Sequence, residues 1–228
     1  MSVTLQNLID DCEADLGDSG NAVWAAADVE QWCRDAIADY SQHFQVTEVS
    51  TINCTDGDRQ YDLPVRFVDA LEVEYPEGED PPQFLQRRPH THPEFWHDEG
   101  YYDILYNNSD SDADELLISS KPATGEDIKL HWTGTYDNSM LTSAAIHVPV
   151  EHHHILRGYV IWRATLQLKA VEEASPTSNS SLLMSQLAIN VDRARRAYVD
   201  SLAKALYATA KSAVVSWKDQ DQATGRIY

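Results

Sequence analysis

The stretch IHVPVEHHHILRGYVIWRATLQLKA, residues 146–170, marks a change in the hydrophobic pattern of the chain. Upstream of it, apolar residues come in short alternating runs, which is typical of strands. From Val150 onward they recur every three to four residues, which is typical of an amphipathic helix. The stretch therefore predicts a junction between a β-region and a long helix. The residues expected to face largely inward on that helix are Ile155, Leu156, Tyr159, Val160, Trp162 and Leu166.

Three consecutive histidines, residues 152–154, lie at this junction. Neighbouring residues of a helix point about 100° apart, so three in a row cannot share one metal ion, whereas ligands at i and i+4 can. The residues four positions further on are Leu156, Arg157 and Gly158, and none of them is a metal ligand. We interpret the three histidines as the solvated first turn of the helix that follows Pro149.

A second helical pattern follows the polar link SPTSNS and runs from Ser181 to about Val215. At 1.5 Å per residue this helix would be about 50 Å long. The tail SWKDQDQATGRIY, residues 216–228, shows no hydrophobic period. The apolar face of the second helix is formed by Leu183, Leu187, Val191, Ala194, Tyr198, Leu202 and Ala205.

Two more helices are predicted near the start of the chain. Residues 3–16 place apolar side chains at helical spacing, and Gly17 then ends the helix. The next helix begins with Asp28 as its N-cap and Gln31 three positions on, as in a capping box. Its apolar face continues to Phe44.

The region between these helix pairs has the period of two that is typical of strands. Asp56-Gly57 predicts a hairpin turn between strands at 45–55 and 59–64, because Gly tolerates positive φ. The next strand, FVDALEVEY, is expected to be mostly buried. Its inward residues would be Val68, Leu71, Val73 and Tyr75.

Three further strands are predicted at 101–107, 114–120 and 127–136, while 83–100 reads as irregular or briefly helical. About six strands at hairpin spacing favour an antiparallel sandwich or barrel. Runs of helices, then strands, then helices argue for an α+β fold, in which the β-region is inserted into a helical bundle.

The domain organisation follows from this order. Residues 1–45 and 150–212 are predicted to form the helical bundle, and residues 46–148 the inserted β-sandwich or barrel-like domain. Residues 213–228 are left as an extended C-terminal arm.

Composition restricts the function. The formal net charge of −20 opposes binding to nucleic-acid phosphates, which requires a basic surface. No apolar run reaches the roughly 18–20 residues of a membrane span, and the start of the chain lacks the basic residues of a secretory signal. Cys12, Cys33 and Cys54 form no CxxC motif, and the first two are expected to be buried, reduced thiols. We therefore expect a soluble protein made in the cytoplasm.

The segment PHTHPEFWHDEG, residues 89–100, is the stronger candidate for a metal site. His90, His92 and His97 could converge there with Glu94 and Asp98. The segment has no HExxH motif, however, and its prolines favour an extended loop, so contacts with a neighbouring protein are the preferred interpretation. The chain also lacks GxGxxG, GxxxxGK[ST] and GxSxG motifs. We predict no catalytic residues, no cofactor and no metal.

A basic cluster interrupts the acidic chain at Arg193, Arg195 and Arg196. These arginines could form surface ion pairs with Asp192 and Asp200. Alternatively they could contact an acidic neighbouring subunit, where the arginine fork is favoured.

The tail carries large side chains without a core of its own, among them Trp217, Ile227 and Tyr228. Such a segment is either frayed or becomes ordered when its aromatic residues fill pockets of a partner.

Taken in order, these motifs resemble the head-to-tail adaptor, or connector, proteins of tailed bacteriophages. The resemblance rests on Trp24 ahead of DVEQWCRDAIADYSQHF, and on the turn and Leu-Pro of DGDRQYDLPVRFVDALEVEY. It continues through YYDILYN, LLISSKPATGEDIKLHWTGTY and the closing helix after IHVPVEHHHILRGYVIWRATL. The match spans nearly the whole chain in the same order.

The resemblance implies a structural virion protein in the neck, assembled in the host cytoplasm. Members of that family form a ring, commonly of about twelve copies, between the portal and the tail or nozzle components. Viral DNA would pass through the ring without sequence-specific binding, and the negative charge would suit such a channel. Arg193, Arg195 and Arg196 would then lie between subunits. The portal-docking arm would include Trp217, Arg226, Ile227 and Tyr228.

Two alternatives stay open from the sequence. One is another phage neck or tail protein, such as a tail terminator or a tail tubular protein. The other is a metal-dependent enzyme centred on His90, His92 and His97.

Overall fold

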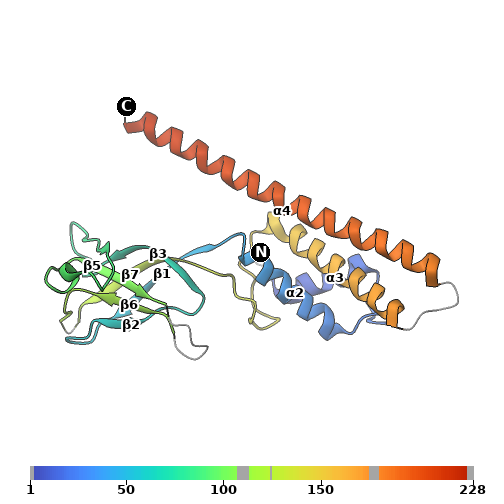
Figure 1. The fold of residues 1–228 in the computed structure, drawn as a ribbon, viewed down its shortest axis with the longest axis horizontal. Helices are drawn as coiled ribbons and strands as arrows, with labels where there is room; N and C mark the ends of the chain where they lie inside the picture. The colour runs from blue at the N-terminus through green and yellow to red at the C-terminus, as the bar shows by residue number, and fades with distance from the viewer. Residues whose placement is uncertain (1–2, 107–112, 124, 175–179, 225–228) are drawn as a thin grey trace. The chain divides into compact units, whose positions relative to one another are not determined.

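The computed structural model describes residues 3–106, 113–123, 125–174 and 180–224 (Figure 1). The chain divides into two compact units. The helical unit contains Met1–His43 and Asp137–Tyr228, and the β unit contains Phe44–Tyr136. The predicted fold class is confirmed: helices at both ends of the chain enclose, in sequence, a β-rich middle region. Its sheets do not close into a barrel.

Helix α1, Leu5–Leu16, ends as the sequence predicts. Gly17 has a φ of 68°, which is the left-handed conformation that ends many helices. At the other end, Thr4 and Asn7 form a capping box. The buried face of α1 contains Leu5, Leu8, Ile9 and Cys12.

Helix α2, Ala26–Ser41, begins earlier than predicted, and Asp28 is not its N-cap. Ala25 takes that position, and its carbonyl accepts the N–H groups of Asp28 and Val29 at 2.9 and 3.3 Å. The alanines ahead of Asp28 are strong helix formers and extend the helix backwards. Asp28 therefore lies in the first turn, where its charge is favourable next to the positive helix end.

The loop before α2 is organised by Asp18, which is only 6% exposed. Its carboxylate accepts the backbone N–H groups of Ala22, Val23 and Trp24 at distances of 2.8–3.2 Å. The bond from Trp24 has the largest effect on the pKa of Asp18. Burial opposes it, and the bonds from Val23 and Ala22 add to it, so that the pKa lies below its usual value.

Replacing Asp18 by Asn is expected to destabilise the helical unit in a pH-dependent way. Because the folded-state pKa lies below the unfolded value of about 3.9, the stabilisation by Asp18 is complete above about pH 4. It is lost as the pH falls through the folded-state value. Denaturant unfolding from pH 6 to pH 2.5 should therefore show a gap between wild type and Asp18→Asn that closes in acid. A gap of constant size over this pH range would contradict this role.

Helix α3, His153–Ala174, follows a short 3₁₀ turn at Val150–His152. Ile155, Leu156 and Val160 are buried as predicted, and Tyr159 and Trp162 are partly buried. The prediction that Leu166 faces inward is wrong, because this residue is 36% exposed. Ala164 is buried instead. Alanine allows the close approach of neighbouring helices, and α3 packs against α1, α2 and α4.

Helix α4, Ser180–Thr224, contains 45 residues and continues past the predicted end at about Val215. Figure 1 shows it running alongside α3 and then beyond the end of that helix. Of its predicted apolar face, Tyr198, Leu202 and Ala205 are buried, whereas Leu183 is 40% exposed. Helix α4 therefore makes contact with α3 over part of its length only.

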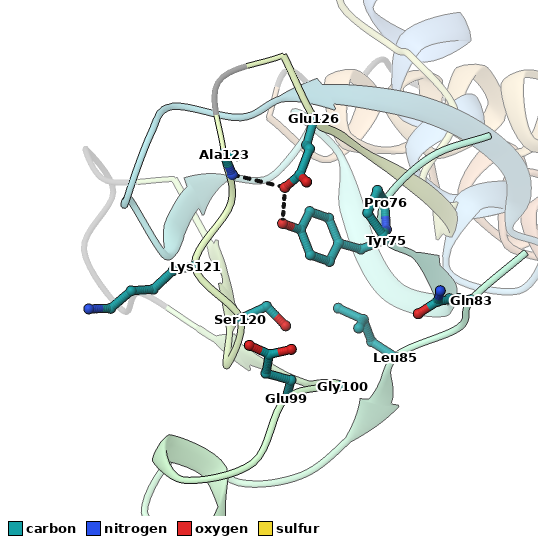
Figure 2. A pocket seen from close by; sticks show the side chains of 10 residues that line it. All are labelled: Tyr75, Pro76, Gln83, Leu85, Glu99, Gly100, Ser120, Lys121, Ala123 and Glu126. Carbon is teal, nitrogen blue, oxygen red and sulfur yellow. Dashed lines mark hydrogen bonds between the residues drawn. The ribbon is translucent and has the colours of Figure 1, made fainter. Parts of the chain in front are cut away.

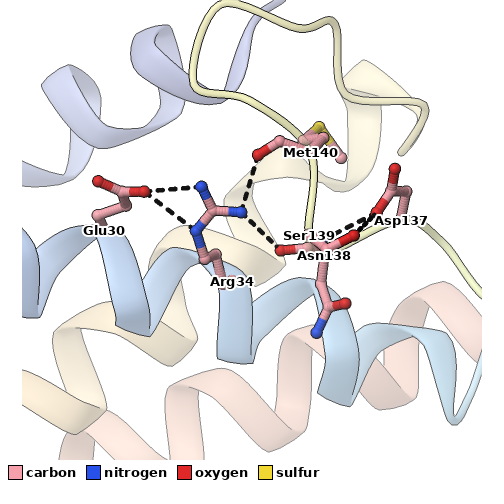
Figure 3. Close-up of polar contacts among 6 residues, drawn as sticks. All are labelled: Glu30, Arg34, Asp137, Asn138, Ser139 and Met140. Atoms are coloured by element: carbon pink, nitrogen blue, oxygen red, sulfur yellow. Dashed lines mark hydrogen bonds and ion pairs between the residues drawn. The ribbon is translucent and has the colours of Figure 1, made fainter.

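The segment between the β unit and α3 is attached to α2 by Arg34 (Figure 3). Its Nη1 donates to the carbonyls of Asn138 and Met140 at 2.8 and 2.9 Å. Glu30 holds the same guanidinium through Nη2 at 2.7 Å. The backbone N–H of Leu5 also donates to the carbonyl of Ala144 at 3.1 Å, so this segment belongs to the helical unit.

Replacing Arg34 by Met is expected to lower the free energy of unfolding of the helical unit by about 1–3 kcal/mol, because two carbonyls lose a charged donor. Hydrogen exchange should become faster in residues 137–146. The matched control is Arg195→Met, which removes an exposed arginine from α4 and should change stability by about 0.5 kcal/mol or less. Equal exchange in the Arg34 variant and the wild type would contradict the attachment.

The β unit consists of two sheets facing each other across one core. The first has the order β1-β7-β3, with β1 at Val46–Asn53, β7 at Asp127–Gly134 and β3 at Phe67–Glu74. The second has the order β2-β6-β5-β4, with strands Gln60–Asp62, Glu115–Ile118, Tyr101–Leu105 and Gln86–Arg87. All pairs are antiparallel except β4 with β5. The short 3₁₀ turn η1, Pro93–Trp96, lies between β4 and β5, where the sequence reads as briefly helical.

The predicted hairpin at Asp56-Gly57 is wrong in its pairing. Gly57 does adopt a positive φ of 79°, but β1 and β2 on either side of it belong to different sheets. A hydrogen bond fixes the turn: the backbone N–H of Gly57 donates to the carbonyl of Pro122 at 3.0 Å. It therefore carries the chain from one layer to the other, so that both strands contribute to the same core.

Buried and partly exposed side chains alternate along β7, and Ile128, Leu130 and Trp132 point into the core. In β3, Val73 is buried as predicted. The prediction that Leu71 is buried is wrong, because this residue is 52% exposed. The pairing of β3 with β7 shifts between Ala70 and Glu72, and this bulge turns Leu71 outward. The remaining core residues are Tyr61, Leu63, Tyr75, Leu85, Tyr102, Ile104, Leu116 and Ile118.

Candidate assembly surfaces

An aromatic cluster fixes the rotation of α4 against α3. The ring of Tyr198 stacks on Trp162 at a centroid distance of 6.1 Å and meets Tyr159 edge-on at 5.5 Å. Gly158 allows this approach, because a Cβ there would already lie 3.7 Å from the Cα of Tyr198. The Tyr198 hydroxyl donates to Asp39 of α2. Burial, followed by this hydrogen bond, raises the pKa of Tyr198 above its ordinary value.

The opposite side of α4 is uncovered by α3. With 3.6 residues per turn, the side chains opposite Tyr198 are those of Ile189, Arg193, Arg196 and Tyr207. We call these four residues, with Asp200, the outer face of α4. Ile189 is 54% exposed and Tyr207 is 72% exposed. Large exposed apolar side chains among charges are typical of a surface that contacts another protein.

Two shallow hollows lie along the outer face. The first has a volume of about 420 Å³ and is lined by Ile189, Asp192, Arg193, Arg196, Ala197 and Asp200. The second has a volume of about 490 Å³ and is lined by Asp200, Ala203, Lys204 and Tyr207. Because both include Asp200, they form one continuous surface along the helix. Open hollows of this kind suit side chains of a neighbouring protein better than an enclosed small molecule.

The three arginines predicted as a cluster divide between two sides of α4. Arg193 and Arg196 line the first hollow, and the Nη2 of Arg196 lies 2.7 Å from Asp192. Arg195 is exposed but is not among the residues that line the hollow. Within the described part of the chain, the predicted ion pair with Asp192 therefore forms, while Arg193 and Arg195 make no ion pair.

Residues 206–210 of α4 are left exposed by the helical unit. Leu206 is 37% exposed, and every residue described from 206 to 210 is exposed. Trp217 lies within the helix, but the structure does not describe its side chain. Arg226, Ile227 and Tyr228, also predicted for the portal-docking arm, lie outside the described residues.

The histidines at the start of α3 act as a junction, as the sequence indicates. The Nδ1 of His152 and the hydroxyl of Tyr40 are 2.6 Å apart. His153 and His154 bond through their rings to the carbonyls of Val148 and Glu151, at 3.0 and 2.7 Å. Burial lowers the pKa of His152, which favours the neutral ring. The three rings point to three different partners and do not converge.

The second histidine segment is also held by local bonds. Asp103 accepts both the backbone N–H of His90 and its ring Nδ1, at 2.8 and 2.7 Å. Burial raises the pKa of Asp103, but the bonds from His90 outweigh this effect and lower it overall. His92 accepts the N–H of Glu94 at 3.3 Å as the cap of a 3₁₀ turn. Among the residues that the structure describes, no three metal-binding side chains come together.

The described helices include none with a stretch long and apolar enough to span a bilayer.

The chain thus combines an α+β fold with an exposed apolar and charged surface on α4. A comparison with protein-family models matches residues 3–212 to the family described as SU10 adaptor protein. Because this match covers most of the chain, the protein belongs to that family, and the predicted resemblance to phage head-to-tail adaptors is confirmed. A search of curated proteins finds no match. The matched region ends at 212, just before the predicted arm.

Sequence reasoning missed two features of these surfaces. The outer face of α4 gives only a weak signal in the sequence: Ile189 and Tyr207 lie off the buried stripe, at the spacing of a second face. The role of Arg34 gave no signal, since its carbonyl partners lie more than a hundred positions away.

Proposed function

We propose that this adaptor forms a closed ring between the portal and the tail components of the virion. The outer face of α4 would contact a neighbouring copy, and Arg193, Arg195 and Arg196 would take part in or flank that contact. The uncovered outer face is the observation that carries the proposal, because a helix of 45 residues leaves apolar and charged groups exposed opposite Tyr198. In a closed ring, every copy would bury such a surface against a neighbouring copy.

The ends of the chain have separate tasks in this proposal. The segment 213–228, with Trp217, Arg226, Ile227 and Tyr228, would dock on the portal. The β unit would face the tail or nozzle protein. Viral DNA would pass through the ring during assembly and ejection, and the net charge of −20 per copy would limit its adhesion. The protein would be assembled in the host cytoplasm and reside in the virion neck.

Removal of residues 216–228 tests the docking arm. The truncated protein should lose only the helical signal of the last part of α4 and should keep its unfolding midpoint and its assembly state, but should no longer be retained by immobilised portal. A chain in which Trp217, Ile227 and Tyr228 are all replaced by serine should behave in the same way, because the apolar anchors are lost while the length is kept. Retention of either protein by the portal at wild-type level would refute the arm.

A further inference from the structure

The β unit contains a hollow that the adaptor role does not explain. It has a volume of about 420 Å³ and lies where four segments meet: the end of β3, the approach to β4, the approach to β5 and the loop between β6 and β7 (Figure 2). Tyr75 and Leu85, which are 8% and 9% exposed, form its apolar part. The backbone N–H of Tyr75 donates to the carbonyl of Gln83 at 2.9 Å, and the backbone N–H of Leu85 donates to the carbonyl of Val73 at 2.8 Å. The walls are therefore fixed by backbone bonds.

A hydroxyl without a partner from its own chain opens into this hollow. Ser120 is 8% exposed, and its side chain makes no hydrogen bond within the residues that the structure describes. Figure 2 shows its hydroxyl directed into the hollow, on the same side as the carboxylate of Glu99. The neighbouring Ser119 is different, because its Oγ accepts the N–H of Tyr101 at 2.9 Å. The hydroxyl has no partner from its own chain but is open to the hollow, since Arg59 Nε is the buried side-chain polar atom without a partner among the described residues. A ligand that enters the hollow can therefore bond to Ser120 in place of water.

The charge around the hollow is negative. Glu126 accepts the Tyr75 hydroxyl and the N–H of Ala123, the latter at 2.8 Å, and these two bonds lower its pKa. Glu99 is exposed and makes no ion pair within the described part of the chain. Lys121 also lines the hollow, but Figure 2 shows its amino group turned away from it. A group that enters therefore meets one unpaired carboxylate and one free hydroxyl, with no cation between them.

We propose that this hollow, the Glu99 pocket, receives an arginine side chain that projects from another protein. The aliphatic part of arginine would lie against Leu85 and Tyr75, and the guanidinium would donate to Glu99 and Ser120. Arginine fits better than lysine, because its planar group presents several donors at once, is less strongly hydrated and can lie on an aromatic ring. Arginine is also enriched among the residues that anchor protein interfaces in pockets. The inference does not depend on ring formation by α4.

The test uses the full chain with ¹³C-labelled leucine methyl groups, in which the Leu85 signal is identified by its loss in Leu85→Met. The probe is the peptide acetyl-Gly-Arg-Gly-amide. Its matched control contains citrulline, which has nearly the same shape but no charge. The arginine peptide should shift the Leu85 signal saturably, and the lysine peptide should require about fivefold more for the same shift. The citrulline peptide and spermidine should give no saturable shift at this signal.

Variants locate the site. Glu99→Gln should weaken the response to the arginine peptide roughly tenfold, because a charge-assisted bond is lost. Ser120→Ala should weaken it by a few-fold. Asp98→Asn, which removes the adjacent exposed carboxylate outside the pocket, should leave it unchanged. The proposal is overturned if the arginine peptide gives no saturable shift, or if citrulline, lysine or spermidine matches it. An unchanged response in Glu99→Gln would overturn it equally.

Discussion

Replacing Trp132 by Ala is expected to lower the free energy of unfolding of the β unit by about 3–5 kcal/mol, which is a large part of the stability of a domain. Trp132 is 1% exposed, and its Nε1 donates to the hydroxyl of Ser50 at 3.0 Å. It also packs against Phe67 with a centroid distance of 6.1 Å. Loss of the indole would leave a cavity between the two sheets.

Hydrogen exchange measured by mass spectrometry separates this effect from a general loss of structure. Peptides that cover β7 and β5 should exchange much faster in Trp132→Ala, whereas peptides of α3 should keep the wild-type rate, because the helical unit has its own core. Trp96→Ala provides a control of the same residue type, since Trp96 is 45% exposed. That change should cost about 1 kcal/mol or less. Equal exchange in the two variants would contradict the assignment of Trp132 to the core.

The second large effect is expected on assembly. Changing Ile189 and Tyr207 on the outer face of α4 to Asp should disperse the proposed ring into single chains, with unchanged helix content. Both residues are more than half exposed, so their replacement removes little packing within the chain. At a subunit interface, the loss of a large anchor costs about 2 kcal/mol or more, and a closed ring carries that loss at every contact.

Light scattering at fixed protein concentration measures this change. The control is Val65→Asp, which introduces the same charge at an apolar residue of the β unit that is 86% exposed. The control should assemble like the wild type. An Ile189→Asp, Tyr207→Asp double variant with the wild-type mass would show that the outer face of α4 does not join copies.

The helices could be predicted because each depends on local pattern. The apolar spacing of α1 and its end at Gly17 can be recognised from neighbouring residues alone. The change of hydrophobic period at Val150 likewise separates α3 from the strands. The errors have a common cause in longer-range structure. Asp28 resembled an N-cap because the sequence does not show that the carbonyl of Ala25 accepts the first hydrogen bonds of the helix. Leu71 resembled a core residue because a β-bulge depends on the pairing with the neighbouring strand.

The strand pairing and the surfaces could be predicted only in part. The turn at Gly57 was recognised, but its strands pair with β6 and β7, which lie far along the chain. The Glu99 pocket unites residues from four separate segments, and the free hydroxyl of Ser120 has no counterpart in any sequence motif. Arg193 and Arg196 could be selected from the sequence, since an arginine cluster is unusual in a chain with a net charge of −20.

The most direct test of the central claim is an electron cryo-microscopy reconstruction of the neck of virions that carry this chain. The account predicts a closed ring of about twelve copies immediately below the portal, with the outer face of each α4 buried against the next copy. A reconstruction in which the chain is missing from the neck, or in which Ile189 and Tyr207 face solvent on every copy, would contradict it.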